Sequence, residues 1–129
     1  SLSLLECLRK VGCQFVRLLQ DPEAIAIFRV IIAEAVNSPH VATLFYQAGP
    51  EASLSTLSDV IEKFGEGSLS RDIAQQLAVD YCALLKGEYH TMMLCGIQSP
   101  LQDEAITAHV NSAAEKILLL FTHYTQQHN

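Results

Sequence analysis

Apolar residues recur at intervals of three and four along most of the chain. Near the start, Leu4, Leu8, Val11, Phe15 and Leu18 follow this spacing, which places them on one face of a helix. No segment shows the strict alternation that is typical of a β-hairpin. The pattern therefore predicts an all-α fold, an antiparallel bundle of about six helices. We expect these helices over about residues 2–20, 22–37, 39–48, 50–65, 70–86 and 101–126, with a short helical turn at about 89–95.

Prolines and glycines set the predicted boundaries. Each proline follows a residue that is suited to capping a helix: Asp21-Pro22, Ser38-Pro39, Gly49-Pro50 and Ser99-Pro100. We therefore expect every proline to begin a helix and none to lie within one. Several glycines follow apolar segments and are expected to end helices: Gly49, Gly65, Gly67 and Gly87. Gly12 is different, because it falls inside the first predicted helix.

The segment from Phe28 to Val36 contains an apolar run that no single helix face can hold. Val30, Ile31 and Ile32 point in three directions if the segment is helical. We therefore expect neighbouring elements to cover this helix on most of its circumference.

The last two long helices indicate a partner. The sequence ILLLF at 117–121 is apolar all round, and small residues flank the apolar stripe of the helix at 70–86, which lets a second helix approach closely. This favours a homodimer over a monomer that simply buries the same residues. The expected interface consists of Leu77, Ala78, Tyr81, Leu84, Val110, Ala113, Ile117 and Phe121.

Composition and charge exclude several classes of function. The 129 residues are enough for a single domain over 1–129, and half of them are hydrophobic. The 8 basic residues are scattered and are outnumbered by 14 acidic ones, so we expect no nucleic-acid binding by this chain alone. No stretch is long enough to span a membrane and no signal segment opens the chain. Four cysteines without a Cys-x-x-Cys pair favour reduced thiols in a cytoplasmic protein.

Catalytic and metal-binding chemistry has little support in the sequence. Glu34 lies among apolar residues, and a structural carboxylate is favoured over a general base. His90, Cys95 and His109 could approach one another, but their spacing fits no compact zinc pattern. No phosphate loop, dinucleotide fingerprint or nucleophile elbow occurs. We therefore expect no enzyme activity, no catalytic residue, no metal and no cofactor.

One long segment resembles a known family. The sequence FRVIIAEAVNSPHVATLFYQAGP at 28–50, with DPEAIAI just before it, is similar to the opening of the C-terminal regulatory domain of TetR-family transcriptional repressors, especially the AefR-like or AcrR-like branch. The matching positions are Arg29 to Ala35, Pro39, and Phe45 to Pro50. The segment GSLSRDIAQQLAVDYCALLKG at 67–87 and the long final helix also fit. The turn at Asn37-Ser38 departs from the family pattern.

The resemblance implies a ligand-sensing and dimerising domain whose N-terminal helix-turn-helix domain is missing, and a truncated chain is expected over a natural stand-alone domain. In such a repressor, a small apolar or aromatic effector occupies a cavity and causes the absent domain to release DNA. The residues expected to line the cavity are Phe15, Phe28, Ile32, Phe45, Leu57, Ile61 and Tyr81, and the Tyr81 hydroxyl could orient a polar end of the ligand. Ordinary core packing remains an alternative for each of them. A helical protein–protein interaction module without a small-molecule ligand is the alternative function.

Overall fold

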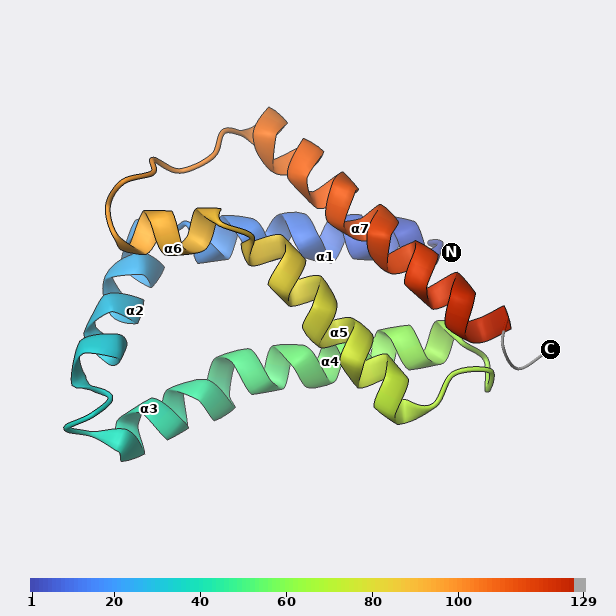
Figure 1. Cartoon of the computed structure of the whole chain (residues 1–129), viewed down its shortest axis with the longest axis horizontal. Helices are drawn as coiled ribbons and strands as arrows, with labels where there is room; N and C mark the ends of the chain where they lie inside the picture. The colour runs from blue at the N-terminus through green and yellow to red at the C-terminus, as the bar shows by residue number, and fades with distance from the viewer. Residues whose placement is uncertain (127–129) are drawn as a thin grey trace.

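Helices make up most of the part of the chain that the structure describes. The computed structural model describes residues 1–126, and residues 127–129 lie outside that description. The elements are α1 (Leu4–Leu19), α2 (Pro22–Glu34), α3 (Pro39–Tyr46), a π-helical turn η1 (Gln47–Glu51), α4 (Ala52–Phe64), α5 (Arg71–Lys86), α6 (Tyr89–Leu94) and α7 (Asp103–Gln126) (Figure 1). No strand occurs in the described residues. The predicted all-α class is confirmed, and the predicted helix boundaries agree closely.

Side-chain caps explain where several helices begin. Ser3 and Glu6 form a capping box at the start of α1, in which the Ser3 hydroxyl accepts from the Glu6 N–H. The Asp21 carboxylate accepts from the backbone N–H groups of the first turn of α2, next to Pro22. The Ser70 hydroxyl accepts from the Ile73 N–H at the start of α5. Each cap supplies an acceptor to N–H groups that have no partner inside the helix.

Pro100, in the loop before α7, does not begin a helix, contrary to the prediction, and neither does Pro50. Pro50 lies inside the π-helical turn η1, which joins α3 to α4 in one continuous helical run (Figure 1). A proline ring excludes the carbonyl four residues earlier from the regular helical bond, and that carbonyl belongs to Tyr46, the last residue of α3. The wider π turn accommodates the ring without ending the helix, so Gly49 is not a helix stop either.

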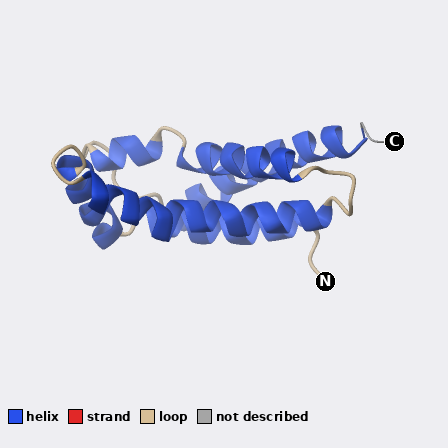
Figure 2. Cartoon of the chain, turned by 90° about the horizontal axis from the view of Figure 1, so that it is seen from below, coloured by secondary structure: helices blue, strands red, loops and turns tan. Residues whose placement is uncertain are grey.

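The helices form two layers (Figure 2), and the core lies between them. α5 packs against α4, α7 packs against α1, and α5 and α7 contact each other. The buried residues of α1 follow one another at intervals of four: Leu4, Leu8, Gly12 and Val16. They meet the buried stripes of α5 and α7 in a single hydrophobic cluster that also includes Leu57 and Ile61 of α4.

Gly12 allows α1 to approach α5 and α7 closely. A Cβ atom at Gly12 would lie 2.7 Å from Val110 Cγ1 and closer still to the Tyr81 hydroxyl oxygen. The Tyr81 side chain is completely buried, and its hydroxyl donates a hydrogen bond to the Leu8 carbonyl. Burial raises the pKa of Tyr81, so this hydroxyl stays protonated as a donor. The glycine therefore provides the room in which this polar group is satisfied.

The expectation that the 28–36 helix is covered on most of its circumference is wrong for the protomer. Ile25 is the only buried residue of α2, and α2 lies at one end of the molecule between α1 and α3 (Figure 1). Val30 is 60% exposed, Ile32 is 55% exposed, and Val36, just after the helix, is 90% exposed. The apolar run thus leaves a large apolar surface on the protomer.

The structure also corrects most of the predicted dimer interface. Six of the eight residues are at most 3% exposed within the protomer: Leu77, Ala78, Tyr81, Val110, Ala113 and Ile117. They face the protomer's own core, because the apolar stripe of each helix is used to pack α5 and α7 onto α4 and α1. Leu84 and Phe121 are half-buried against the same core.

Two sets of polar contacts join segments that are far apart in the sequence. The Arg29 guanidinium on α2 donates to the Leu94 carbonyl at 2.8 Å and to the Met93 carbonyl at 3.0 Å. The Gln20 amide after α1 exchanges two hydrogen bonds of 2.9 Å with the backbone of Leu101, just before α7. These contacts hold α2 against α6 and the long loop against α1. Within the described residues, no helix is long and apolar enough to cross a bilayer.

Candidate ligand-binding pocket

An apolar pocket of about 270 Å³ lies between six elements: α1, α2, α3, η1, α4 and α5. Its wall comes from α1, α2, the continuous α3–α4 run and α5, and Figure 1 shows how these helices are arranged. The residues that line it are Phe15, Leu18, Leu19, Ala24, Ile27, Phe28, Phe45, Gly49, Pro50, Ser53, Leu54, Cys82 and Lys86. The volume is close to the lower end of the range of roughly 300–1,000 Å³ that is typical of small-molecule sites. The pocket therefore suits a small ligand.

Aromatic rings form one wall of this pocket. The Phe28 ring on α2 meets the Phe45 ring on α3 edge to face, with ring centroids 5.5 Å apart and planes at 90°. The Phe28 ring also meets the His90 ring of α6 edge to face, with centroids 5.0 Å apart and planes at 89°. Edge-to-face contacts of this kind are favourable because the positive edge of one ring faces the negative face of the next. Phe28 is thus held in place by α3 and α6 together.

Few polar groups reach the pocket, and most of them are uncharged. Burial raises the pKa of the Cys82 thiol, and the nearby Lys86 ammonium only partly opposes this effect. Cys82 therefore presents a protonated thiol rather than a nucleophilic thiolate. Burial and the same ammonium lower the pKa of His90 below its ordinary value. His90 is only 8% exposed and its Nε2 atom has no hydrogen-bond partner, so its ring packs as a neutral aromatic group next to Phe28.

The structure brings together three of the seven residues that were expected to line the cavity. Phe15, Phe28 and Phe45 line the pocket. Leu57, Ile61 and Tyr81 lie in the hydrophobic core instead, because they are on the faces of α4 and α5 that pack against each other and against α1. Ile32 is 55% exposed on α2 and does not line the pocket. The Tyr81 hydroxyl cannot orient a ligand there, because it is bonded to the Leu8 carbonyl.

Sequence reasoning missed most of the remaining wall. Leu18 and Leu19 follow Phe15 by three and four residues, so helical spacing could have found them. Cys82 and Lys86 are one turn apart on α5, and a lysine at the end of an apolar helix was also a visible signal. Gly49 and Pro50 could not have been found, because their place in the wall depends on the π turn. The missed residues are mostly half-buried or exposed, whereas the prediction selected the bulkiest apolar side chains.

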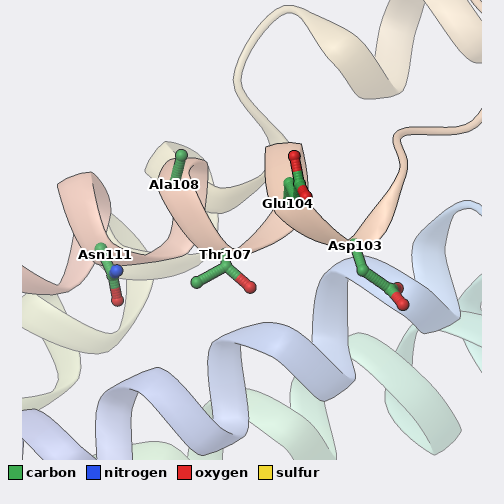
Figure 3. A pocket seen from close by; sticks show the side chains of 5 residues that line it. All are labelled: Asp103, Glu104, Thr107, Ala108 and Asn111. Atoms are coloured by element: carbon green, nitrogen blue, oxygen red, sulfur yellow. The ribbon is translucent and has the colours of Figure 1, made fainter.

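A second hollow, of about 410 Å³, runs along the first turns of α7. Asp103, Glu104, Thr107, Ala108 and Asn111 line it, and all of them belong to one helix (Figure 3). Their side chains point to different sides of that helix rather than toward a common centre. Without an opposite wall this hollow is a shallow surface feature. Within residues 1–126, no group of three or more His, Cys, Asp or Glu side chains could hold a metal ion.

The residues considered for zinc take separate roles. The His109 Nε2 atom lies 2.7 Å from the Leu85 carbonyl oxygen, and the His109 ring packs edge to face against Tyr89. His90 packs against Phe28, and Cys95 is exposed. These three side chains are engaged with different neighbours rather than with one another.

Comparison with protein families identifies the class of domain. The chain belongs to the C-terminal regulatory domains of TetR-family transcription regulators. The matching model describes the C-terminal domain of AefR-like transcriptional repressors, and it spans residues 6–123. Domains of this family typically dimerise and bind small-molecule effectors, which points to a regulator of transcription rather than an enzyme. No curated protein matches the chain, and no solved structure matches it.

Proposed function

We propose that this chain is the effector-binding and dimerisation domain of a TetR-type repressor, and that a small apolar or aromatic molecule binds in the pocket between α1, α2, α3, α4 and α5. The observation that carries the proposal is the pocket itself, whose wall is almost entirely apolar and contains three phenylalanines. Such a regulator works on DNA in the cytoplasm. In this proposal a helix-turn-helix domain of the kind found in the family contacts the DNA, since the 8 basic residues of this chain are scattered along the sequence and outnumbered by 14 acidic ones.

The position of the pocket supports a regulatory role. Its wall includes α1, to which a head domain would be attached in this family, and the π turn η1. π turns are uncommon and occur frequently at functional sites. A ligand that fills the pocket would contact α1 and the α3–α4 run at the same time. It would change the position of α1 relative to this run only if it bound one relative position more tightly than another.

We propose that the dimer forms through the exposed sides of α5 and α7, which contact each other and run side by side (Figure 1). Gln76, Val79 and Ala83 share the solvent side of α5 at intervals of three and four. On α7, Ala108, Ser112 and Leu119 are exposed, and Leu119 is 73% exposed. Small and apolar side chains on two adjacent helices allow close packing in a four-helix interface.

A pocket-filling substitution tests the ligand-binding proposal. Ala24 lines the pocket and Ala26, two residues further along α2, is exposed outside it. A thermal-shift screen of apolar and aromatic compounds should find molecules that raise the melting temperature of the wild-type chain, because they bind only the folded form. Ala24→Phe should abolish this stabilisation, and the matched control Ala26→Phe should keep it. A screen without any stabilising compound, or compounds that stabilise Ala24→Phe equally well, would contradict the proposal.

The exposed apolar surface favours a second candidate, a helical module that recruits another protein. Residues of α2, α3 and the link between them expose large apolar side chains: Ile27, Val30, Ile32, Val36, Val41 and Leu44. Patches of this kind commonly mark interaction sites. The two candidates differ in the pocket test, because a module without a ligand would show no Ala24-dependent stabilisation by any small molecule.

A further inference from the structure

Lys86 is the one charged residue in the wall of the apolar pocket, within the part of the chain that the structure describes. It lies at the end of α5 and is half-buried. A lysine in this place can rest its apolar stem on the wall while its ammonium group reaches a polar partner. The identity of that partner is therefore informative.

No carboxylate in residues 1–126 pairs with the Lys86 ammonium. The ion pairs in this part of the chain are made by arginines, namely Arg9, Arg17 and Arg71. Cys82 and His90 are close enough for the Lys86 charge to affect them, but the protonated thiol and the neutral imidazole supply no negative charge. The carbonyl end of α5 offsets part of the positive charge. The half-buried Lys86 therefore offers an ammonium group beside the apolar pocket without a carboxylate partner.

We propose that the ligand is a small amphipathic anion, with an apolar or aromatic body among Phe15, Phe28 and Phe45 and a carboxylate or similar anionic group bound by the Lys86 ammonium. This inference rests on the proposed ligand-binding function of the same pocket. The volume of about 270 Å³ limits the body of the ligand to a short chain or a small ring system. The net charge of −6 repels anions at long range. Salt screens this repulsion over about 8 Å at physiological ionic strength. Direct contact with Lys86 therefore decides whether the pocket prefers an anionic ligand to a neutral one.

Matched pairs of carboxylates and primary amides test the anionic group directly. The probes are hydrocinnamate with hydrocinnamamide and octanoate with octanamide, since each pair keeps the apolar body and changes only the charge. Calorimetric titration should show that the carboxylate binds the wild-type chain about 10- to 100-fold more tightly than its amide, the range expected for one charge-assisted hydrogen bond. Lys86→Gln should remove this preference. Lys86→Arg should retain it, because the positive charge remains.

Lys63 provides the control for general charge effects. It is exposed in the last turn of α4 and does not line the pocket, so Lys63→Gln should keep the full preference for carboxylates. Circular dichroism and chemical unfolding establish that each variant is folded before titration. Amides that bind as tightly as carboxylates, a preference that survives Lys86→Gln, or carboxylates that fail to bind at all would each overturn the inference. The proposal that the pocket binds small molecules would still stand if other compounds stabilised the wild-type chain and not Ala24→Phe. The experiments therefore distinguish a failure of the anionic-ligand inference from a failure of the ligand-binding proposal.

Discussion

Gly12→Ala is expected to destabilise the domain, although alanine is the better helix former. Within a helix, alanine in place of glycine gains about 0.5–1 kcal/mol. At this position the new methyl group would lie 2.7 Å from Val110 Cγ1 and even closer to the Tyr81 hydroxyl. Val110 and Tyr81 are both completely buried, so neither side chain can move into solvent. Overpacking of this kind costs about 1–3 kcal/mol.

The same methyl group would displace the Tyr81 hydroxyl from the Leu8 carbonyl. Losing that buried hydrogen bond costs about another 1 kcal/mol. The unfavourable effects exceed the gain in helix propensity, and we expect a net loss of about 1–3 kcal/mol in the free energy of unfolding. Urea unfolding followed by circular dichroism measures the change from the shift in the transition midpoint.

Tyr81→Phe supplies the matched background for this test. Without the hydroxyl, one of the two close contacts at Gly12 is absent, so Gly12→Ala should cost less in this background than in the wild type. A double-mutant cycle measures the difference as a coupling energy between the two positions. A neutral or stabilising effect of Gly12→Ala, or an equal cost in both backgrounds, would refute the reasoning that α1 approaches α5 too closely for a side chain.

Three further predictions follow from the proposed interface, the pocket wall and the buried histidine. Val79→Glu places a charge on the exposed side of α5 and should convert the dimer to a monomer, as measured by light scattering. The control Gln14→Glu, on the exposed side of α1, should leave the dimer intact. A wild-type chain that is monomeric at roughly tens of micromolar would reject this interface. Phe28→Ala should weaken ligand binding and lower the free energy of unfolding by less than about 3 kcal/mol, because the ring is only half-buried, and titration with unfolding measures both effects. The pKa of His90 is lower in the folded chain than in the unfolded chain. As the pH falls through about 6.5, the unfolded chain therefore binds a proton at His90 more readily than the folded chain does, and the free energy of unfolding decreases. His90→Phe should reduce that loss between about pH 7.5 and 5.5, while His40→Phe, at an exposed position, should not; equal pH dependence in wild type and His90→Phe would contradict the assignment.

Local signals in the sequence were sufficient for the fold class and most helix boundaries. Capping residues such as Asp21 and Ser70 mark helix starts because they act on the nearest turn alone. Pro50 misled the prediction because its effect depends on the whole α3–α4 run, in which a π turn accommodates the ring. Periodicity located the apolar stripes of α5 and α7, but it could not tell whether a stripe faces the protomer's own core or a second copy.

The pocket was harder to predict than the core for a related reason. Phe15, Phe28 and Phe45 were identified because large aromatic side chains suit both cores and ligand sites. Tyr81 was misplaced because its hydroxyl appeared suited to a ligand, whereas the structure gives it a backbone partner 73 residues away along the chain. Lys86 was not selected at all, since its value as a site residue depends on the absence of a carboxylate beside it. Whether a carboxylate lies beside Lys86 depends on how the chain folds.

The π turn also sets the angle at which α3 presents its side chains. Its hydrogen bonds span five residues rather than four, so η1 contains one residue more than a regular helix would need over the same turn. Removing one residue from Gln47–Glu51 would allow α3 and α4 to run as one regular helix, but it would rotate every α3 side chain by about 100° around the axis. Phe45 would then leave the pocket, and Phe28 would lose one of its two edge-to-face contacts, the one with Phe45. In related chains, the number of residues in this turn is therefore expected to select the shape of the ligand while leaving the bundle intact.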